Sequence, residues 1–119
     1  MPDISKSDWN LFRERLPKWQ ENYMDRLLKE YSELINSSGK PSERFWKLEE
    51  RLKKDRKHPG VILSLRKSEA MWDIAAFVKQ DVITMDDLDG FSQEVKDYVK
   101  KWLSSEWCKN LSFEMSLLR

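Results

Sequence analysis

The stretch SDWNLFRERLPKWQENYMDRLLKEYSEL, residues 7–34, decides the fold of this chain. Its large apolar side chains recur every three or four positions, so they lie along one face of an α-helix. These residues are Trp9, Phe12, Leu16, Trp19, Tyr23, Leu27, Tyr31 and Leu34. Ser7 is a suitable N-cap, and Asp8 favours the positive end of the helix dipole. We therefore predict a long amphipathic helix that ends at the turn-forming residues 36–41.

Pro17 interrupts this helical pattern. A proline inside a helix removes one hydrogen bond and clashes with the preceding turn, at a cost of about 3 kcal/mol. Two arrangements accommodate it: a kink near residues 13–16, or a short helix followed by a second one with Pro17 in its first turn. We expect a break or kink near Leu16.

A second helix is predicted from Ser42, an N-cap residue directly after Pro41, to about Arg56. Its buried line consists of Phe45, Leu48 and Leu52. Trp46 lies off that line. The breaker His58-Pro59-Gly60 ends this segment.

A third helix is predicted from Gly60 or Val61 to Lys79. Its apolar face is broad, as in the central helices of bundles, so we expect it to be the most buried helix. That face consists of Val61, Leu65, Met71, Trp72, Ala75 and Val78.

The segment 83–91 predicts one short helical turn, in which Thr84 and Asp87 have the spacing of a capping box. Ser92 then caps a final helix over residues 93–107. The residues that this helix is expected to bury are Val95, Tyr98, Val99, Trp102 and Leu103.

The composition fits one all-α domain. Only three glycines and four prolines occur in 119 residues, and six tryptophans, five phenylalanines and three tyrosines argue against disorder. We predict a small bundle of four to five helices over residues 1–119, with 1–6 and 109–119 either flexible or ordered by a partner. Residues 108–119 fit a strand or a helix equally well.

Charge and cysteine content indicate a cytoplasmic protein. The formal net charge is +1, which gives no overall field toward nucleic acid or an anionic membrane. The single cysteine, Cys108, allows no intrachain disulfide and fits a reducing compartment. Residues 1–16 carry three acidic residues and no apolar core, so we do not expect them to act as a signal peptide, and no apolar run approaches the roughly 20 residues that span a bilayer. We therefore expect no membrane association.

Catalytic chemistry has little support in the sequence. His58 is the only histidine, and neither it nor Cys108 has metal-ligand spacing with other residues. Cys108 near a helix C-terminus faces the negative end of the dipole, which raises the pKa of a thiol. The acidic cluster at residues 86–89 lacks the pattern of a calcium loop. We predict no enzyme activity, no catalytic or metal site, and no cofactor.

The tryptophans support the leading functional hypothesis. Six are more than a few short helices need for a core, and tryptophan is enriched in interface hot spots. We predict a small interaction or regulatory protein that presents an aromatic-rich helical surface to a protein partner or to itself. The candidate contact residues are Trp9, Trp19, Trp46 and Trp107. Tertiary core packing remains the alternative role for these side chains.

A basic stretch around residues 51–67 supports an alternative, a nucleic-acid-associated protein. The candidate contact residues are Lys53, Lys54, Arg56, Lys57, Arg66 and Lys67. Asp55 interrupts this stretch, and Glu49 and Glu50 lie beside it. Basic residues near a helix C-terminus also stabilise the helix dipole without any partner, which favours a solvated helix end.

Overall fold

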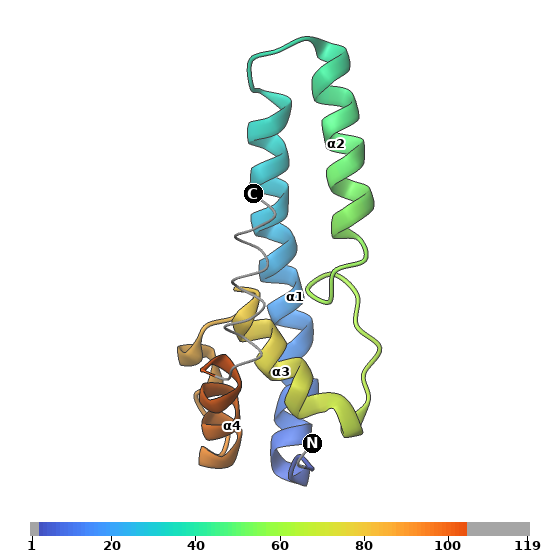
Figure 1. Cartoon of the computed structure of the whole chain (residues 1–119). Helices are drawn as coiled ribbons and strands as arrows, with labels where there is room; N and C mark the ends of the chain where they lie inside the picture. The colour runs from blue at the N-terminus through green and yellow to red at the C-terminus, as the bar shows by residue number, and fades with distance from the viewer. Residues whose placement is uncertain (1–2, 105–119) are drawn as a thin grey trace. The chain divides into compact units, whose positions relative to one another are not determined.

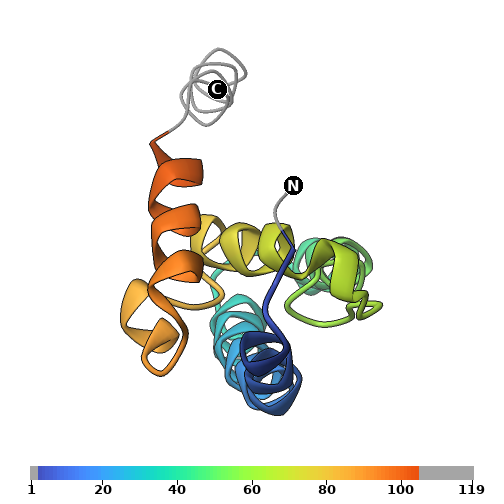
Figure 2. The same cartoon turned by 90° about the horizontal axis from the view of Figure 1, so that it is seen from below.

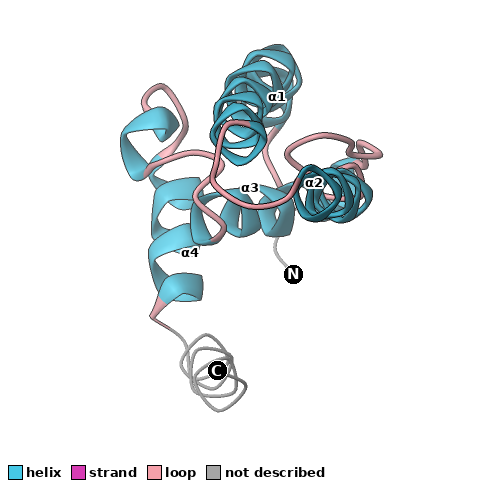
Figure 3. Cartoon of the chain, turned by 90° about the horizontal axis from the view of Figure 1, so that it is seen from above, coloured by secondary structure: helices cyan, strands magenta, loops and turns pink. Residues whose placement is uncertain are grey.

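The computed structural model describes residues 3–104 and shows an all-α chain (Figure 1). Its elements are α1 (Lys6–Ile35), α2 (Pro41–Asp55), the 3-10 helix η1 (Lys67–Glu69), α3 (Ala70–Lys79), the 3-10 helix η2 (Met85–Leu88) and α4 (Gln93–Leu103). Residues 3–104 contain only helices, turns and loops, without a strand (Figure 3). The predicted all-α fold with four to five helices is therefore confirmed. In the same residues, no helix is both long enough and apolar enough to span a membrane.

The described residues form two compact units, and the division between them falls inside α1, after Glu14. Residues 3–14 and 65–104 belong to the first, which we name the core unit. Residues 15–64 form the second, which we name the hairpin unit. The expectation of one domain over residues 1–119 stays a prediction.

α1 continues through Pro17, so a break near Leu16 is wrong, and a kink there stays a prediction. Proline has no backbone N–H, and the carbonyl of Arg13 therefore loses its helical partner. Arg13 and Pro17 are both exposed. Water can hydrogen-bond this carbonyl, so the missing bond does not force the helix to end.

The start of α1 is capped by Ser5, not by the predicted Ser7. The Asp8 amide donates to Ser5 Oγ (3.1 Å), and the Ser5 hydroxyl donates to Asp8 Oδ2 (2.8 Å). Asp8 is buried and also binds Ser92, whose amide donates to Oδ1 (2.9 Å) and whose hydroxyl donates to Oδ2 (2.6 Å). Asp8 therefore links the first turns of α1 and α4 within the core unit, in addition to the dipole role that the sequence indicated.

The interior of the core unit is built around α3, which packs against the crosswise α4 (Figure 2). Seven of the ten residues of α3 are buried, as its broad apolar face predicted. Phe77 of α3 and Phe12 of α1 are fully buried and meet edge to face, with ring centroids 6.4 Å apart. The other large, fully buried side chains are Met71, Ile74, Leu88, Val95 and Val99.

The third helix begins about nine residues later than predicted, at Ala70. The amides of Val61 and Ile62 both donate to the His58 carbonyl (2.8 and 2.9 Å), which closes a turn at this point. Residues 62–66 then continue without helical structure. Val61 and Leu65 are therefore not on α3, and this part of the prediction is wrong.

The predicted caps of the last two elements are confirmed. Thr84 and Asp87 form the capping box of η2, with the Thr84 amide donating to Asp87 Oδ2 (2.8 Å). The Ser92 side chain accepts from the Val95 amide (3.4 Å) at the start of α4. The predictions for Trp107, Cys108 and residues 108–119 lie outside the described residues.

Candidate functional site: the open face of the α1–α2 hairpin

In the hairpin unit, α2 turns a mostly polar line of side chains toward α1. This line is Arg44, Leu48, Arg51 and Asp55, at spacings that keep one face of a helix, and each of the four is half-buried or buried. The predicted buried line, Phe45, Leu48 and Leu52, differs from this observed line by about one residue at either end, which corresponds to a rotation of α2 about its axis. Phe45 is 63% exposed and Leu52 is 47% exposed, so their predicted burial is wrong. Leu48 alone belongs to both lines.

A buried polar cluster joins the two helices. Tyr31 of α1 donates its hydroxyl to Asp55 Oδ2 of α2 (2.6 Å). Arg51 forms ion pairs with Asp55 (3.4 Å) and with Glu30 (3.1 Å), and its guanidinium lies 5.5 Å from the centre of the Tyr31 ring. These long side chains bridge the helices, which explains why a polar line can take the place of an apolar one.

Two members of this cluster, Tyr31 and Arg51, have raised pKa values. Burial raises the pKa of Tyr31 to about 12, and the hydrogen bond to Asp55 and its negative charge add to this rise. The hydrogen bond to Glu30 raises the pKa of Arg51, with the charge of Asp55 in support. Tyr31 therefore remains a donor and Arg51 a cation at neutral pH. A cluster whose members satisfy one another provides a structural link rather than a reactive group.

The opposite end of the hairpin is closed by a short turn at residues 36–40 (Figure 1). Gly39 has a φ of +124°, a conformation that other residues rarely adopt. Arg44 donates to the Ile35 carbonyl (2.6 Å) and to the Gly39 carbonyl (3.3 Å). These bonds satisfy carbonyls at the C-terminal end of α1 and set the register of α2 against it.

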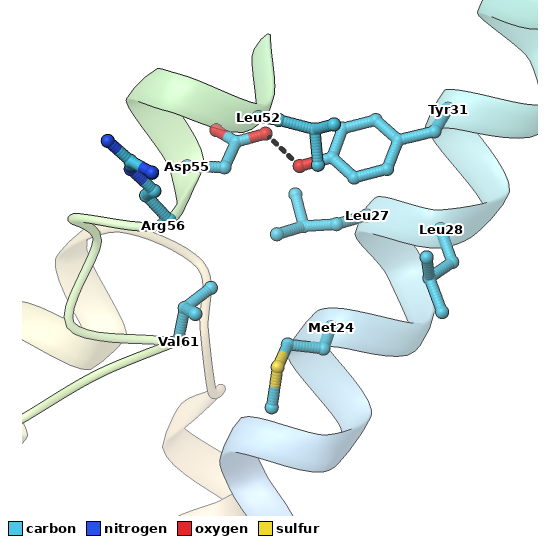
Figure 4. Close-up of a pocket in the computed structure, with 8 residues that line it drawn as sticks. All are labelled: Met24, Leu27, Leu28, Tyr31, Leu52, Asp55, Arg56 and Val61. Atoms are coloured by element: carbon cyan, nitrogen blue, oxygen red, sulfur yellow. Dashed lines mark hydrogen bonds between the residues drawn. The ribbon is translucent and has the colours of Figure 1, made fainter. Parts of the chain in front are cut away.

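Beside the polar line, the hairpin carries an apolar pocket of about 220 Å³ (Figure 4). It is lined by Met24, Leu27, Leu28 and Tyr31 of α1, by Leu52, Asp55 and Arg56 at the end of α2, and by Val61 of the following loop. Leu27 and Val61 point into the space between the helices (Figure 4). Leu28 remains 63% exposed at its margin.

Two further apolar residues extend the pocket along the hairpin. Ile35 lies seven residues after Leu28 on α1, and Phe45 lies seven residues before Leu52 on α2. Seven residues make two helical turns, so each belongs to the same stripe as its partner. Ile35 is 47% exposed. We name the set of exposed or half-buried residues Met24, Leu28, Ile35, Phe45 and Leu52 the open face.

The loop after α2 is held on α1 by specific contacts. His58 stacks on Tyr23, with ring centroids 4.9 Å apart, and its Nδ1 accepts from the Gly60 amide (2.9 Å). Gln20 donates its amide to the Pro59 carbonyl (3.0 Å). A side chain at Gly60 would overlap the Tyr23 ring, so glycine is required there. Burial lowers the pKa of His58, against the opposing effect of Asp55.

The predicted tryptophan contacts fall in different environments. Trp46 is 62% exposed and meets the Phe45 ring edge-on at 5.0 Å, beside the open face. Trp9 is half-buried and has the Arg13 guanidinium 5.7 Å from its ring. Trp19 is buried, and Trp107 lies outside the described residues. Of the predicted contact residues within 3–104, Trp46 presents the widest surface.

Trp72 was predicted to face the core, but it is 43% exposed, so this prediction is wrong. It meets Trp102 edge to face at 6.2 Å, at the margin of α3 and α4. The reason is the position of Trp72 on α3, between buried neighbours that already fill the inner face.

The basic candidates also divide between the units. Lys53, Lys54, Arg56 and Lys57 lie at the C-terminal end of α2 and are exposed, and none of the four forms an ion pair with another described residue. Arg66 and Lys67 belong to the core unit, where Arg66 is 3.9 Å from Glu69.

Two features were missed by the sequence analysis. Leu28 and Ile35 lie off the main apolar stripe of α1. Together with Met24 they form a second stripe, which is visible in the sequence only as the spacing of four residues from Met24 to Leu28 and seven from Leu28 to Ile35. Asp73 of α3 is buried, with an Oδ2 that has no hydrogen-bond partner. Burial, with the charge of Glu69, raises the pKa of Asp73 to about 6. No sequence signal marked it.

Within residues 3–104, no cluster of three or more potential metal ligands occurs. The chain matches no protein-family model, and neither a curated protein nor a solved structure is significantly similar to it.

Proposed function

We propose that this chain is a small, non-enzymatic protein-interaction or regulatory protein of the cytoplasm, and that it binds a protein through the open face of its hairpin unit. One observation carries the proposal. Of the eight large apolar side chains that are exposed in residues 3–104, six lie in the hairpin unit: Leu28, Ile35, Phe45, Trp46, Leu52 and Ile62.

Leaving these apolar side chains in water costs free energy. Each Å² of apolar surface left in water forgoes about 25 cal/mol that burial would provide. Single exposed apolar residues are ordinary, but a contiguous patch beside a pocket is typical of binding surfaces. The open face joins aliphatic stripes on two helices, with the Phe45–Trp46 pair at one end. Helical grooves of this kind take the apolar face of a partner helix.

The test is site-specific cross-linking in extracts of the native cell. A photoreactive phenylalanine analogue at Leu52 faces the open face, whereas the same analogue at Lys54 points to the opposite side of α2, about 200° around the helix. We expect Leu52 adducts that the Phe45→Glu substitution removes. Adducts of equal yield from both positions, or none from Leu52, would contradict the proposal.

A second candidate function is nucleic-acid association, favoured by four exposed cations at the end of α2 that form no ion pair within residues 3–104. It predicts retention of the purified chain on nucleic acid at low salt and loss of that binding between about 50 and 200 mM salt. Absence of retention at low salt would exclude it.

A further inference from the structure

We infer that the occupant of the open face is the open face of a second copy of this chain, so that two hairpins close a four-helix bundle. The inference rests on the function proposed above and names its partner. In the proposed arrangement, the two-fold axis runs parallel to the helices, and α1 of each copy packs against α2 of the other.

The hairpin unit has only part of the core that a four-helix bundle needs. Four-helix bundles bury a stripe from every helix in one central core. The hairpin unit has two such stripes, Met24–Leu28–Ile35 on α1 and Phe45–Leu52 on α2, and they flank the same pocket. Each stripe includes a two-turn step of about 10 Å, from Leu28 to Ile35 or from Phe45 to Leu52. Two hairpins therefore supply the four stripes that a bundle needs.

The register of the two helices makes the two faces match. The Glu30–Arg51 ion pair, the Ile35–Arg44 bond and the pocket that Leu28 and Leu52 share show which levels of α1 and α2 lie side by side. Rotation about an axis parallel to the helices keeps those levels, so Ile35 of one copy meets Phe45 of the other. By the same rule, Leu28 meets Leu52. Apolar side chains thus face apolar side chains along both stripes.

Charges beside the two stripes support the same pairing. Glu21 and Asp25 border the α1 stripe on its outer side, where Asp25 also forms an exposed ion pair with Lys29 of its own helix (3.1 Å). On α2, Arg56 borders the stripe and Lys57 follows it. The levels given above place Asp25 beside these cations when α1 packs against α2 of the other copy. An axis across the helices would instead place α1 against α1 in the reversed direction, which would not bring Asp25 to Arg56.

The decisive experiment measures the mass of the purified full chain by sedimentation equilibrium over a wide concentration range. We expect a monomer–dimer equilibrium for the natural sequence. Phe45→Glu should abolish the dimer, and so should Leu28→Glu, because each places charges in the apolar centre. Lys54→Glu, on the opposite side of α2, is the matched control and should dimerise normally. Far-ultraviolet circular dichroism confirms that each variant keeps its helices.

Charge reversal tests the pairing of α1 with α2. Asp25→Lys alone and Arg56→Glu alone should each raise the dimer Kd about tenfold, since each places like charges together at two symmetric positions. The double variant should restore Kd to near its natural value. A dimer unaffected by Phe45→Glu, or a double variant weaker than both single ones, would overturn the inference.

The two proposals fail separately. A chain that stays monomeric at every concentration overturns the second-copy inference, and Leu52 adducts with a different protein would then still support the proposed function. A monomeric chain without Leu52 adducts contradicts both.

Discussion

The core unit and the hairpin unit treat the same kinds of side chain in opposite ways. Of the 18 apolar residues buried in the described part of the chain, 14 belong to the core unit and four to the hairpin unit, namely Leu16, Trp19, Leu27 and Tyr31. The large exposed apolar residues are distributed the other way, two against six. An apolar stripe on a helix thus specifies a face to be covered, but it does not specify whether the cover comes from the same chain.

The polar groups differ as well. In the hairpin unit, the buried Asp55 is satisfied by Tyr31 and Arg51. The core unit buries two carboxylates in contrasting states: Asp8 accepts from Ser5 and Ser92, whereas Asp73 has an oxygen without a partner. The better-packed unit therefore contains the less favourable polar group. Each prediction below tests one side of this comparison.

The largest expected effect is the loss of a core ring. Phe77→Ala should lower the free energy of unfolding by about 3–5 kcal/mol, because Phe77 is fully buried and its removal leaves a cavity beside Phe12. Urea denaturation followed by circular dichroism measures the change. Phe45→Ala removes the same side chain from the hairpin surface and should cost less than about 0.5 kcal/mol in the monomer. Equal losses would show that the two units do not differ in packing.

The next effect is a gain in stability from Asp73→Asn. One pKa unit corresponds to about 1.4 kcal/mol, so the rise from 3.8 to about 6 corresponds to about 3 kcal/mol against the folded state when Asp73 is ionised. Asparagine removes the charge but keeps a buried polar group, so we expect a gain of about 2 kcal/mol at pH 7. Urea denaturation of both proteins provides the measurement.

The pH dependence of Asp73 has a definite sign. Its pKa is raised in the folded state, so the penalty is complete above about pH 6 and disappears as the pH falls toward 3.8. The advantage of Asp73→Asn should therefore shrink between pH 7 and pH 4.

Asp8 is the internal contrast: burial alone would raise its pKa, but the hydrogen bonds from Ser92 and Ser5 lower it. Its contribution is present above pH 3.8 and is lost below, so Asp8→Asn should destabilise throughout the range from pH 4 to pH 7.

A smaller loss is expected from Tyr31→Phe in the hairpin unit. The substitution keeps the ring under Arg51 but leaves Asp55 without the hydroxyl at 2.6 Å. We expect a loss of about 1–2 kcal/mol, since a buried charged acceptor loses one donor. Hydrogen exchange of the amides in residues 51–55 would localise the change. Unaltered exchange would mean that the polar cluster does not hold α2 in place.

The elements of this fold were largely predictable from local sequence. The Thr84–Asp87 spacing and Ser92 mark the starts of η2 and α4, because capping depends on neighbouring residues. The predicted cap at Ser42 is wrong: α2 begins at Pro41, with Lys40 at the N-cap position, because proline suits the first helical position. The effect of Pro17 was not predictable, because its cost depends on whether the carbonyl of Arg13 reaches water, which is a tertiary property. The cap at Ser5 was not predictable either, because Asp8, which bonds to Ser5, is held by Ser92, far away in the sequence.

The candidate site was harder to predict. Trp46 was expected to lie off the buried line and is exposed, but the rotation of α2 that exposes Phe45 depends on the Tyr31–Asp55 and Arg51 contacts. Hydrophobic periodicity favours Phe45 and Leu52 as the buried line. Polar pairs between helices leave no periodic pattern in the sequence. A single sequence therefore cannot show that such pairs take the place of the apolar line on the inner side of α2.

The smallest predicted effect is a local opening of the loop at His58 in mild acid. Its pKa is lowered by burial, so its neutral form is favoured and the loop is most stable above pH 6.5. Protonation turns Nδ1 from an acceptor into a donor, which breaks the bond from the Gly60 amide and weakens the turn by about 1 kcal/mol or less. Nuclear magnetic resonance should give a His58 pKa below 6.5 and lower amide protection factors at residues 60–62, relative to the intrinsic exchange rate at each pH, as the pH falls through that value.

Over the same pH range, protonation of Asp73 stabilises the core unit, so mild acid should affect the two units in opposite directions. His58→Phe preserves the stack on Tyr23 without the acceptor and should show the lower protection factors already at pH 7. A His58 pKa at or above 6.5 would mean that Asp55, not burial, governs this ring. The loop beside the open face would then not open in mild acid.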